Sequence, residues 1–241
     1  FNLRKNIKAY NLACIDIIEE CKIKKIRKLK IHQPVVYRAN TSICSLSPAE
    51  LLYKSEIIYR NRVGIDLTYD IHKIKSNFRK SYKQLVNKEK SEKIEVYFGS
   101  IPDAVFGKFV DKHFFLAGRK TKSDICWDIL KKFIKEEKAI LVSINNDFLF
   151  FFTSKDYSYY GISAAAPENS VGHKLMWRSI QWLNENGFLF LDLGANYLSA
   201  PEKCIHASES YDIDKLIKIS FFKSGFANVH SLDVYSSFLL K

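Results

Sequence analysis

The sequence predicts an α+β fold built on a mixed, mostly antiparallel sheet, and two observations lead to this prediction. The first is a series of three short apolar runs, separated by polar residues that are typical of hairpin turns. The runs are 139–144, 148–153 and 157–163, and the turns are 145–147 and 154–156. The second is a helical pattern at 171–186 that passes through Gly187 into an apolar run at 188–193, which predicts a crossover to a parallel strand.

The first part of the chain gives weaker patterns. Residues 5–29 look helical, and a poorly patterned stretch follows. A strand is expected at 62–68 and a helix at 70–90, because apolar residues recur through the latter at helical spacing. The regular order of elements begins near residue 93. We therefore expect a basic, largely helical N-terminal part over 1–92 and a second domain over 93–241.

Beyond residue 92 we expect a strand, two helices, the meander, the crossover, a last helix and one or two closing strands. Pro102 suits the start of the first of these helices and Gly118 the position after its end. Ser123 suits the N-cap of the next helix. Outside the meander and the crossover, the ranges are 93–98, 102–118, 123–138, 213–224 and 228–240.

Composition indicates a folded protein without a membrane span. Of the 241 residues, 47% are apolar and 14% are aromatic, enough to build a sizeable core. The apolar runs are too short to cross a bilayer, and the chain begins without a signal-peptide pattern. The five cysteines are scattered and form no CxxC pair, which indicates reduced thiols and argues against a zinc site. We expect a cytoplasmic protein, with peripheral binding to the inner membrane face as an additional possibility.

The net charge of +12 comes from two segments. Residues 1–30 hold nine Lys or Arg against three acids, and residues 71–93 hold eight against two, so each segment is +6. From residue 94 onward the two signs balance. Basic segments favour anionic partners such as RNA or an anionic membrane. Solvated helix faces in a lysine-rich protein remain the alternative.

Four segments resemble those of Fem-type acyltransferases, the aminoacyltransferases of peptidoglycan bridges and their relatives. The segments are HFFLAGRKTKSDICW, YYGISAA, GHKLMWRSIQWLNENGFLFLDLG and FFKSGFA, and the resemblance covers roughly residues 70–235. These proteins have the Gcn5-related N-acyltransferase (GNAT) fold, in which two central strands splay apart around a cleft flanked by helices. Full-length Fem proteins carry two such domains, whereas this chain has room for one. The resemblance implies aminoacyl-tRNA as the donor, without a tightly bound cofactor.

In such a fold the donor lies in the splay, where small side chains let it approach the backbone. The expected donor-binding residues follow the meander's last strand and open the next helix: Gly161, Ile162, Ser163, Ala164, Gly172, His173 and Lys174. The start of a helix favours a phosphate. However, the acetyltransferase loop motif is only partly met, since Pro167 and Ser170 replace its Gln/Arg and its first Gly. Acyl-CoA is therefore the alternative donor, and a plain linker is the alternative to any donor site.

Three residues are predicted to be catalytic. Lys223 of the FFKSGFA motif faces the reaction centre in related enzymes, where an ammonium stabilises an oxyanion; a solvated lysine at a helix end is the alternative. Asp192 can orient or deprotonate the acceptor amine, or else accept backbone hydrogen bonds at the Gly194 turn. Tyr159 and Tyr160 alternate, so that one is expected in the core and one in the cleft, and Tyr160 is our candidate.

Two further residues match the related pattern of acceptor binding. His113 and Arg119 occupy its positions, and an arginine can hold an anionic acceptor through paired hydrogen bonds. The sequence shows no metal-binding cluster and no nucleophilic triad. This favours direct transfer without a covalent enzyme intermediate. The resemblance implies an acyltransferase that moves an acyl or aminoacyl group onto an amine of a cell-envelope or glycan precursor. The alternatives are an acetyl-CoA-dependent amino-sugar N-acetyltransferase and a catalytically silent relative that binds RNA or anionic membrane.

Overall fold

The computed structural model describes residues 16–17, 19–21, 23–25, 28–36, 55–87, 93–166, 171–198 and 212–239. The chain divides into two compact units. One comprises residues 1–62, 195–220 and 230–241, and the other comprises residues 63–194 and 221–229. Sequence analysis placed a domain boundary near residue 93, where the acyltransferase-like part was expected to begin, and that boundary stays a prediction. The second compact unit begins at Val63. All candidate site residues lie in this second unit.

An eight-stranded sheet of order β1-β8-β2-β7-β6-β5-β4-β3 runs through the described residues. The pairs β1–β8, β3–β4, β4–β5 and β5–β6 are antiparallel and β6–β7 is parallel, so the predicted mixed, mostly antiparallel sheet is confirmed. The strands are β1 Lys28–Val36, β2 Ser55–Asp66, β3 Glu95–Tyr97, β4 Ala139–Ile144, β5 Asp147–Ser154, β6 Tyr157–Ala164, β7 Phe190–Ala195 and β8 Val229–Leu239. The helices are α3 Ile71–Ser76, α4 Lys80–Asn87, α5 Asp103–Ala117, α6 Asp124–Lys135, α7 Val171–Glu185 and α9 Ile213–Ser224.

The meander forms as its turn residues predict. Strands β4 and β5 pair in register from Ala139↔Phe152 to Ile144↔Asp147. Asn145 and Asn146 both adopt positive φ, 47° and 65°, which suits the twist of a two-residue hairpin. All six residues of β4 are buried, so this strand lies inside the unit, with helices on both faces of the sheet.

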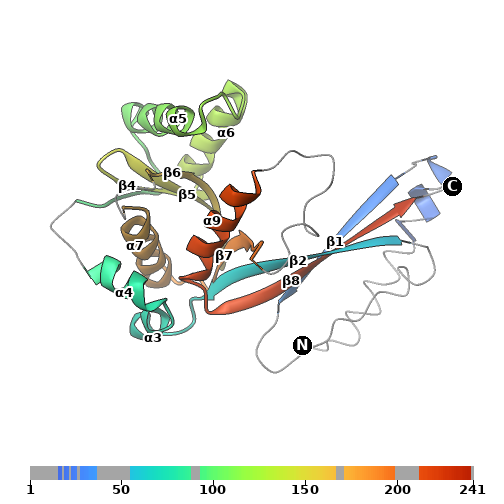
Figure 1. Ribbon diagram of the computed structural model, residues 1–241. Coiled ribbons are helices and arrows are strands. Elements are labelled where there is room, and N and C mark those ends of the chain that lie inside the picture. Colours follow the sequence, from blue (N-terminus) through green and yellow to red (C-terminus); the bar gives the residue numbers. More distant parts are fainter. Residues whose placement is uncertain are drawn as a thin grey trace. The chain divides into compact units, whose positions relative to one another are not determined.

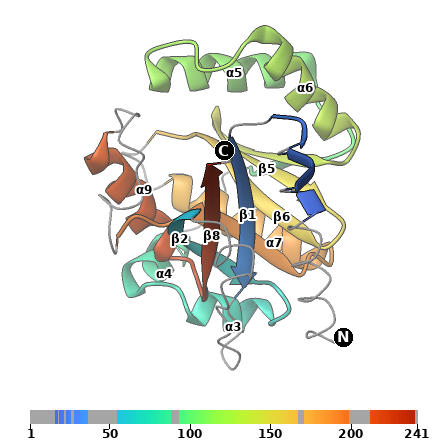
Figure 2. The ribbon, with the colours of Figure 1, turned by 90° about the vertical axis from the view of Figure 1, so that its right-hand side faces the viewer.

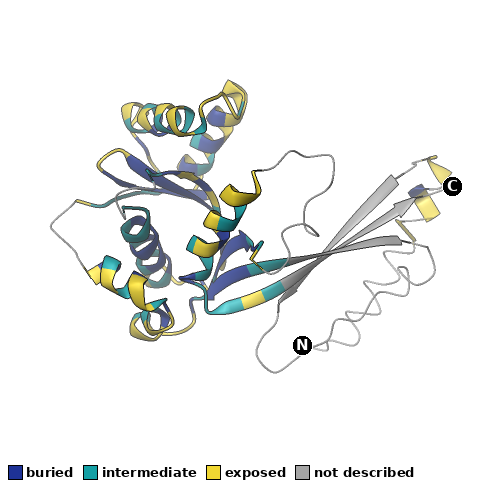
Figure 3. Ribbon diagram, viewed as in Figure 1, coloured by how far each residue is buried: buried dark blue, intermediate teal, exposed yellow. Residues whose placement is uncertain are grey.

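Two apolar clusters hold the sheet between its helices. On one face, α7 packs with α3 and α4 through buried residues such as Ile74, Val86 and Leu175. On the other face, α5 and α6 pack through Phe109 and Trp127. Figures 1 and 2 show these two helical layers on opposite sides of β4, β5 and β6, and Figure 3 shows the buried strands between them.

Several local signals act as predicted. The hydroxyl of Ser123 caps α6 by accepting a hydrogen bond from the backbone of Cys126. Gly118, with φ 65°, ends α5 in the left-handed conformation that glycine favours. The predicted elements of the second unit are present within a few residues of their expected ends. The helix expected at 5–29 falls mostly outside the described residues, and strand β1 was not predicted.

The single helix predicted at 70–90 is wrong, because the structure divides it into α3 and α4. Asn77 ends α3, and its amide donates to the carbonyl of Lys73. The backbone N–H of Arg79 donates to the carbonyl of Gly225, 2.8 Å away, instead of to a residue of the preceding turn. A hydrogen bond to a distant segment therefore interrupts the helix, and this could not be read from apolar spacing.

Candidate active site

The gap predicted between two neighbouring strands is present. Strands β6 and β7 pair in parallel over three residues, from Tyr157↔Phe190 to Tyr159↔Asp192. Beyond this point β6 continues to Ala164 and β7 to Ala195, without further pairing between them. The ladder thus opens after Tyr159, and the backbone of each strand faces the gap from there on. This confirms the splayed sheet.

A β-bulge at Gly161 decides which side chains of β6 face which layer. Phe151 pairs with Tyr160 and Phe150 pairs with Ile162, so that Gly161 is the extra residue. As a result, Tyr160 packs against the α7 layer, whereas Ile162 and Ala164 are buried in the α5–α6 layer. The side chains of Ile162 and Ala164 are therefore core residues, and only their backbone is available to a donor. Gly161 and Ser163 are exposed.

Lys223 reaches into the open end of the gap. It lies in the last turn of α9 and is half-buried. Its Nζ is 5.7 Å from the centre of the Tyr160 ring and 3.3 Å from the point where a Cβ on Gly194 would lie. The hydroxyl of Tyr159 lies 3.6 Å from that same point. Residues from both splayed strands therefore converge on the ammonium of Lys223.

Gly194 is needed at this place for two reasons. Its φ of 87° lies in the left-handed region, which strains residues that have a side chain. A Cβ would also come within 3.3 Å of the Lys223 ammonium. With glycine at position 194, no side chain from this residue fills the open end of the gap.

Asp192 is buried and accepts hydrogen bonds at both carboxylate oxygens. The backbone N–H of Gly194 donates to Oδ1 at 2.6 Å, and the hydroxyl of Tyr157 donates to Oδ2. This arrangement fits the structural alternative, in which the carboxylate fixes the turn at Gly194, more directly than it fits a free general base. Tyr157, which sequence analysis missed, is thus part of this network. It forms the first β6–β7 pair, two residues before the last pair at Tyr159, and no sequence motif pointed to it.

Tyr160 is suited to donate a hydrogen bond and not to act as a base. Burial raises the pKa of its phenol to about 12, and a hydrogen bond with Ser163 acts in the opposite direction. The phenol therefore stays protonated at neutral pH. The residue as a whole is half-buried, and it lies on the strand that borders the gap.

The turn after Lys223 is held by close aromatic packing. A Cβ on Gly225 would lie 2.0 Å from the ring of Tyr82 on α4, so that only glycine fits there. The Tyr82 hydroxyl donates to the carbonyl of Phe221, and the Arg79 guanidinium lies 3.6 Å from the centre of the Phe221 ring. Arg79, expected among the basic residues available to RNA, therefore supports the end of α9. Tyr82 and Arg79 fix the turn that presents Lys223.

The first turn of α7 carries the remaining predicted donor-binding residues. The ring of His173 lies 4.4 Å from Tyr82 and 5.0 Å from Phe222, measured between ring centres. Phe222 also lies 3.9 Å from where a Cβ on Gly172 would be. Aromatic rings thus cover this turn at His173, while Lys174 is half-buried next to it. Residues 167–170, which complete the predicted phosphate loop, lie outside the described residues.

The predicted acceptor residues lie at the end of α5. His113 packs edge-on against Trp127 of α6, and its Nδ1 is buried without a hydrogen-bond partner. Burial lowers the pKa of this imidazole, and the nearby Lys122 ammonium lowers it further. Arg119 is exposed in the turn that follows. The structure therefore ties His113 to Trp127 and Lys122, and its role with Arg119 in acceptor binding stays a prediction.

The described residues contain neither a metal-binding group nor a membrane-spanning helix. No group of three or more His, Cys, Asp or Glu is placed to hold a metal ion in the part of the chain that the structure describes. Within the same residues, no helix is both long and apolar enough to cross a bilayer.

Comparison with solved structures confirms the fold. FemX superposes with a TM-score of 0.64 at 11% identity, covering 96% of this chain and 77% of FemX. L-PGS from Bacillus licheniformis superposes with a TM-score of 0.61 at 12% identity, covering 95% of this chain and 73% of L-PGS. A tandem GNAT protein from the clavulanic acid biosynthesis pathway gives 0.50 at 9% identity, covering 91% of this chain and 66% of that one, slightly under two thirds.

No protein-family model matches the sequence, and a search of curated proteins finds no similar sequence. At identities of 9 to 12%, the structural likeness establishes the fold alone. The chain therefore has a GNAT-like fold that is similar to the fold of FemX, as the resemblance implied.

Proposed function

We propose that this protein is an acyltransferase that moves an acyl or aminoacyl group from an activated ester or thioester onto an amine. The observation that supports it best is the position of Lys223. Its ammonium lies at the open end of the β6–β7 gap, beside Gly194, Tyr159 and Tyr160. A fixed positive charge in a partly desolvated gap is what an acyl-transfer transition state requires.

The reaction we propose is direct transfer. The acceptor amine attacks the donor carbonyl, and a C–N bond forms as the carbonyl electrons move onto oxygen. The ammonium of Lys223 stabilises this oxyanion, and the protonated phenol of Tyr160 is a second hydrogen-bond donor nearby. Collapse of the intermediate breaks the C–O or C–S bond to the leaving group, which takes up the proton lost by the amine. Asp192 acts indirectly, because it fixes the turn at Gly194.

Aminoacyl-tRNA is the donor that we favour. The first turn of α7 is packed against Tyr82 and Phe222 through His173, and its loop matches the acetyl-CoA motif only in part. Aminoacyl-tRNA, which the Fem resemblance implies, does not need a pyrophosphate loop. The acceptor that we expect is an amine on a cell-envelope or glycan precursor. Acyl-CoA with an amino-sugar acceptor is the second candidate, because the splayed strands would suit that donor equally well.

A donor comparison tests the proposal. The purified protein is incubated in single-turnover mode with labelled aminoacyl-tRNA or acetyl-CoA and a panel of amine acceptors, and products are identified by mass spectrometry. Transfer from aminoacyl-tRNA is the expected result, and transfer from acetyl-CoA alone would favour the second candidate. If neither donor acylates any amine faster than the no-enzyme control, the proposed function is wrong.

RNA binding gives an independent check on the donor. If tRNA binds the basic segment at 71–93, the logarithm of the affinity should fall linearly with the logarithm of salt concentration. Reversing three charges there should remove most of the binding and lower the slope by about 2–3. The charges are those of Lys80, Lys83 and Lys88, the last of which lies outside the described residues. Unchanged binding in a normally folded variant would favour acyl-CoA.

A further inference from the structure

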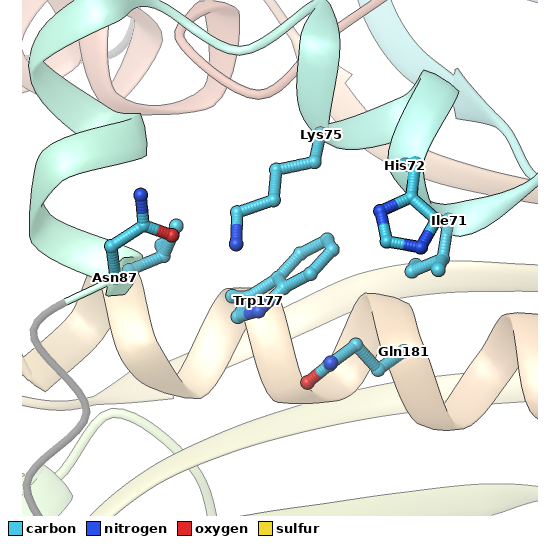
Figure 4. Close-up of a pocket in the computed structure, with 7 residues that line it drawn as sticks. Ile71, His72, Lys75, Asn87, Trp177 and Gln181 are labelled. Carbon is cyan, nitrogen blue, oxygen red and sulfur yellow. The ribbon is translucent and has the colours of Figure 1, made fainter.

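A pocket lies between α3, α4 and α7, away from the gap at Lys223. Its volume is about 240 Å³, and Figure 4 shows its lining residues. The lining residues are Ile71, His72, Lys75, Val86, Asn87, Trp177 and Gln181. Three of these are apolar, two are carboxamides, and two are basic or able to become so. None is acidic.

Lys75 dominates the charge of this pocket. Its Nζ lies 5.1 Å from the centre of the Trp177 ring, and Figure 4 shows the side chain extending across the pocket toward Asn87. Among the described residues, no carboxylate pairs with it. Residues 71–87 contain four other cations and no acid: Lys73, Arg79, Lys80 and Lys83. The pocket therefore favours a ligand with a negative charge.

The remaining lining residues indicate that the ligand also has hydrogen-bonding groups and an apolar ring. A bare phosphate needs only hydrogen-bond donors, whereas the amides of Asn87 and Gln181 each offer a donor and an acceptor. Paired donors and acceptors match the edge of a nucleobase. Half-buried Ile71 lines one side of the pocket, and the buried Val86 and Trp177 form its apolar floor, so one edge of a flat ring can rest there. At about 240 Å³ the pocket is smaller than most sites that enclose a whole ligand, so one ring fits inside and the charged group lies at the rim.

We propose that this pocket binds a nucleoside phosphate, with its base against Trp177 and between the two amides, and its phosphate on Lys75 and His72. The same chemistry is presented by a free nucleotide and by one residue of an RNA strand. The proposal does not depend on the proposed acyl transfer, because no lining residue belongs to the gap at Lys223.

The test is equilibrium binding followed by tryptophan fluorescence and calorimetry on the full chain. The probes are AMP, adenosine and ribose 5-phosphate, which separate the contributions of the base and the phosphate. We expect AMP to bind at least about tenfold more tightly than either fragment, because only AMP uses both halves of the site. If ribose 5-phosphate binds as tightly as AMP, or if AMP does not bind to the folded protein, the proposal is overturned.

Two variants locate the site. Lys75→Met keeps the side-chain stem and removes the charge, and we expect it to weaken AMP binding roughly tenfold or more and to leave adenosine unaffected. Lys108→Met is the matched control, since Lys108 is exposed on α5 and does not line the pocket. Equal affinities for AMP in both variants, with equal melting temperatures, would overturn the assignment.

An oligoadenylate of five residues distinguishes a free nucleotide from a nucleotide within an RNA strand as the ligand. Tighter binding than AMP, with a steeper dependence on salt, identifies an RNA strand that also uses the cations outside the pocket. Affinity equal to that of AMP identifies a free nucleotide. Either result supports the nucleoside phosphate site, provided that Lys75→Met weakens the binding of both probes.

Discussion

Replacing Lys223 with methionine separates its chemical role from its structural one. Methionine keeps much of the stem but removes the charge beside Gly194 and Tyr160. Loss of one oxyanion-stabilising group costs on the order of 3–4 kcal/mol in the transition state, so the rate of transfer should fall roughly a hundredfold to a thousandfold. Donor binding should change much less, because the charge on the oxygen develops only in the transition state.

The structural cost of the same change is small. Lys223 is half-buried, and the contact of its ammonium with the Tyr160 ring is worth about 0.5–1 kcal/mol. For a chain of this size such a loss lowers the melting temperature by roughly 1–4 °C. Single-turnover transfer, donor affinity and thermal melting are therefore measured in parallel. Equal transfer rates in two equally stable proteins would remove Lys223 from the mechanism.

Two further predictions concern stability. Gly225→Ala places a methyl group 2.0 Å from the Tyr82 ring and should lower the free energy of unfolding by about 1–3 kcal/mol. Gly107→Ala on α5 is the control: nothing lies within 4 Å of its Cβ position, so the free energy of unfolding should rise by up to about 1 kcal/mol. If urea unfolding shows the same change for both variants, the close packing of Gly225 against Tyr82 is contradicted. Burial and Lys122 lower the pKa of His113 in the folded protein. The stability contributed by neutral His113 is thus complete above the unfolded-state pKa, about 6.5, and is lost as pH falls toward the folded-state pKa. His113→Asn should flatten the fall in melting temperature between pH 7 and 5, and parallel curves would refute this.

Local patterns predicted most of the second unit because the conformation of a turn or a helix cap is set mainly by the few residues within it. Asn145 and Asn146 adopt positive φ in the hairpin, and Gly118 does so at the end of α5. The gap was also predicted correctly, but from the resemblance and the element order rather than from any single residue. Strand pairing beyond Tyr159 depends on how two distant segments diverge, which no local pattern specifies.

Local patterns do not suffice where contacts between distant segments override local preference. Simple alternation would place Tyr160 and Ile162 on the same face of β6, but the bulge at Gly161 sends them to opposite layers. Tyr82 is one of the apolar residues that recur at helical spacing over 70–90, yet nothing in that spacing revealed its contact with Gly225. In both cases a glycine permits a close approach, and the sequence does not show which group approaches.

The position of Lys223 also bears on the choice between an enzyme and a catalytically silent relative. A silent protein could tolerate a lysine that points to solvent, since no substrate would then need its charge. Here Tyr82, Arg79 and Gly225 fix the turn that follows Lys223, and Asp192 fixes the facing turn at Gly194. These contacts come from separate segments and bring the ammonium to the one place where β6 and β7 separate. A purely structural lysine does not require two diverging strands beside it, so this convergence supports catalysis more strongly than the presence of the motif alone.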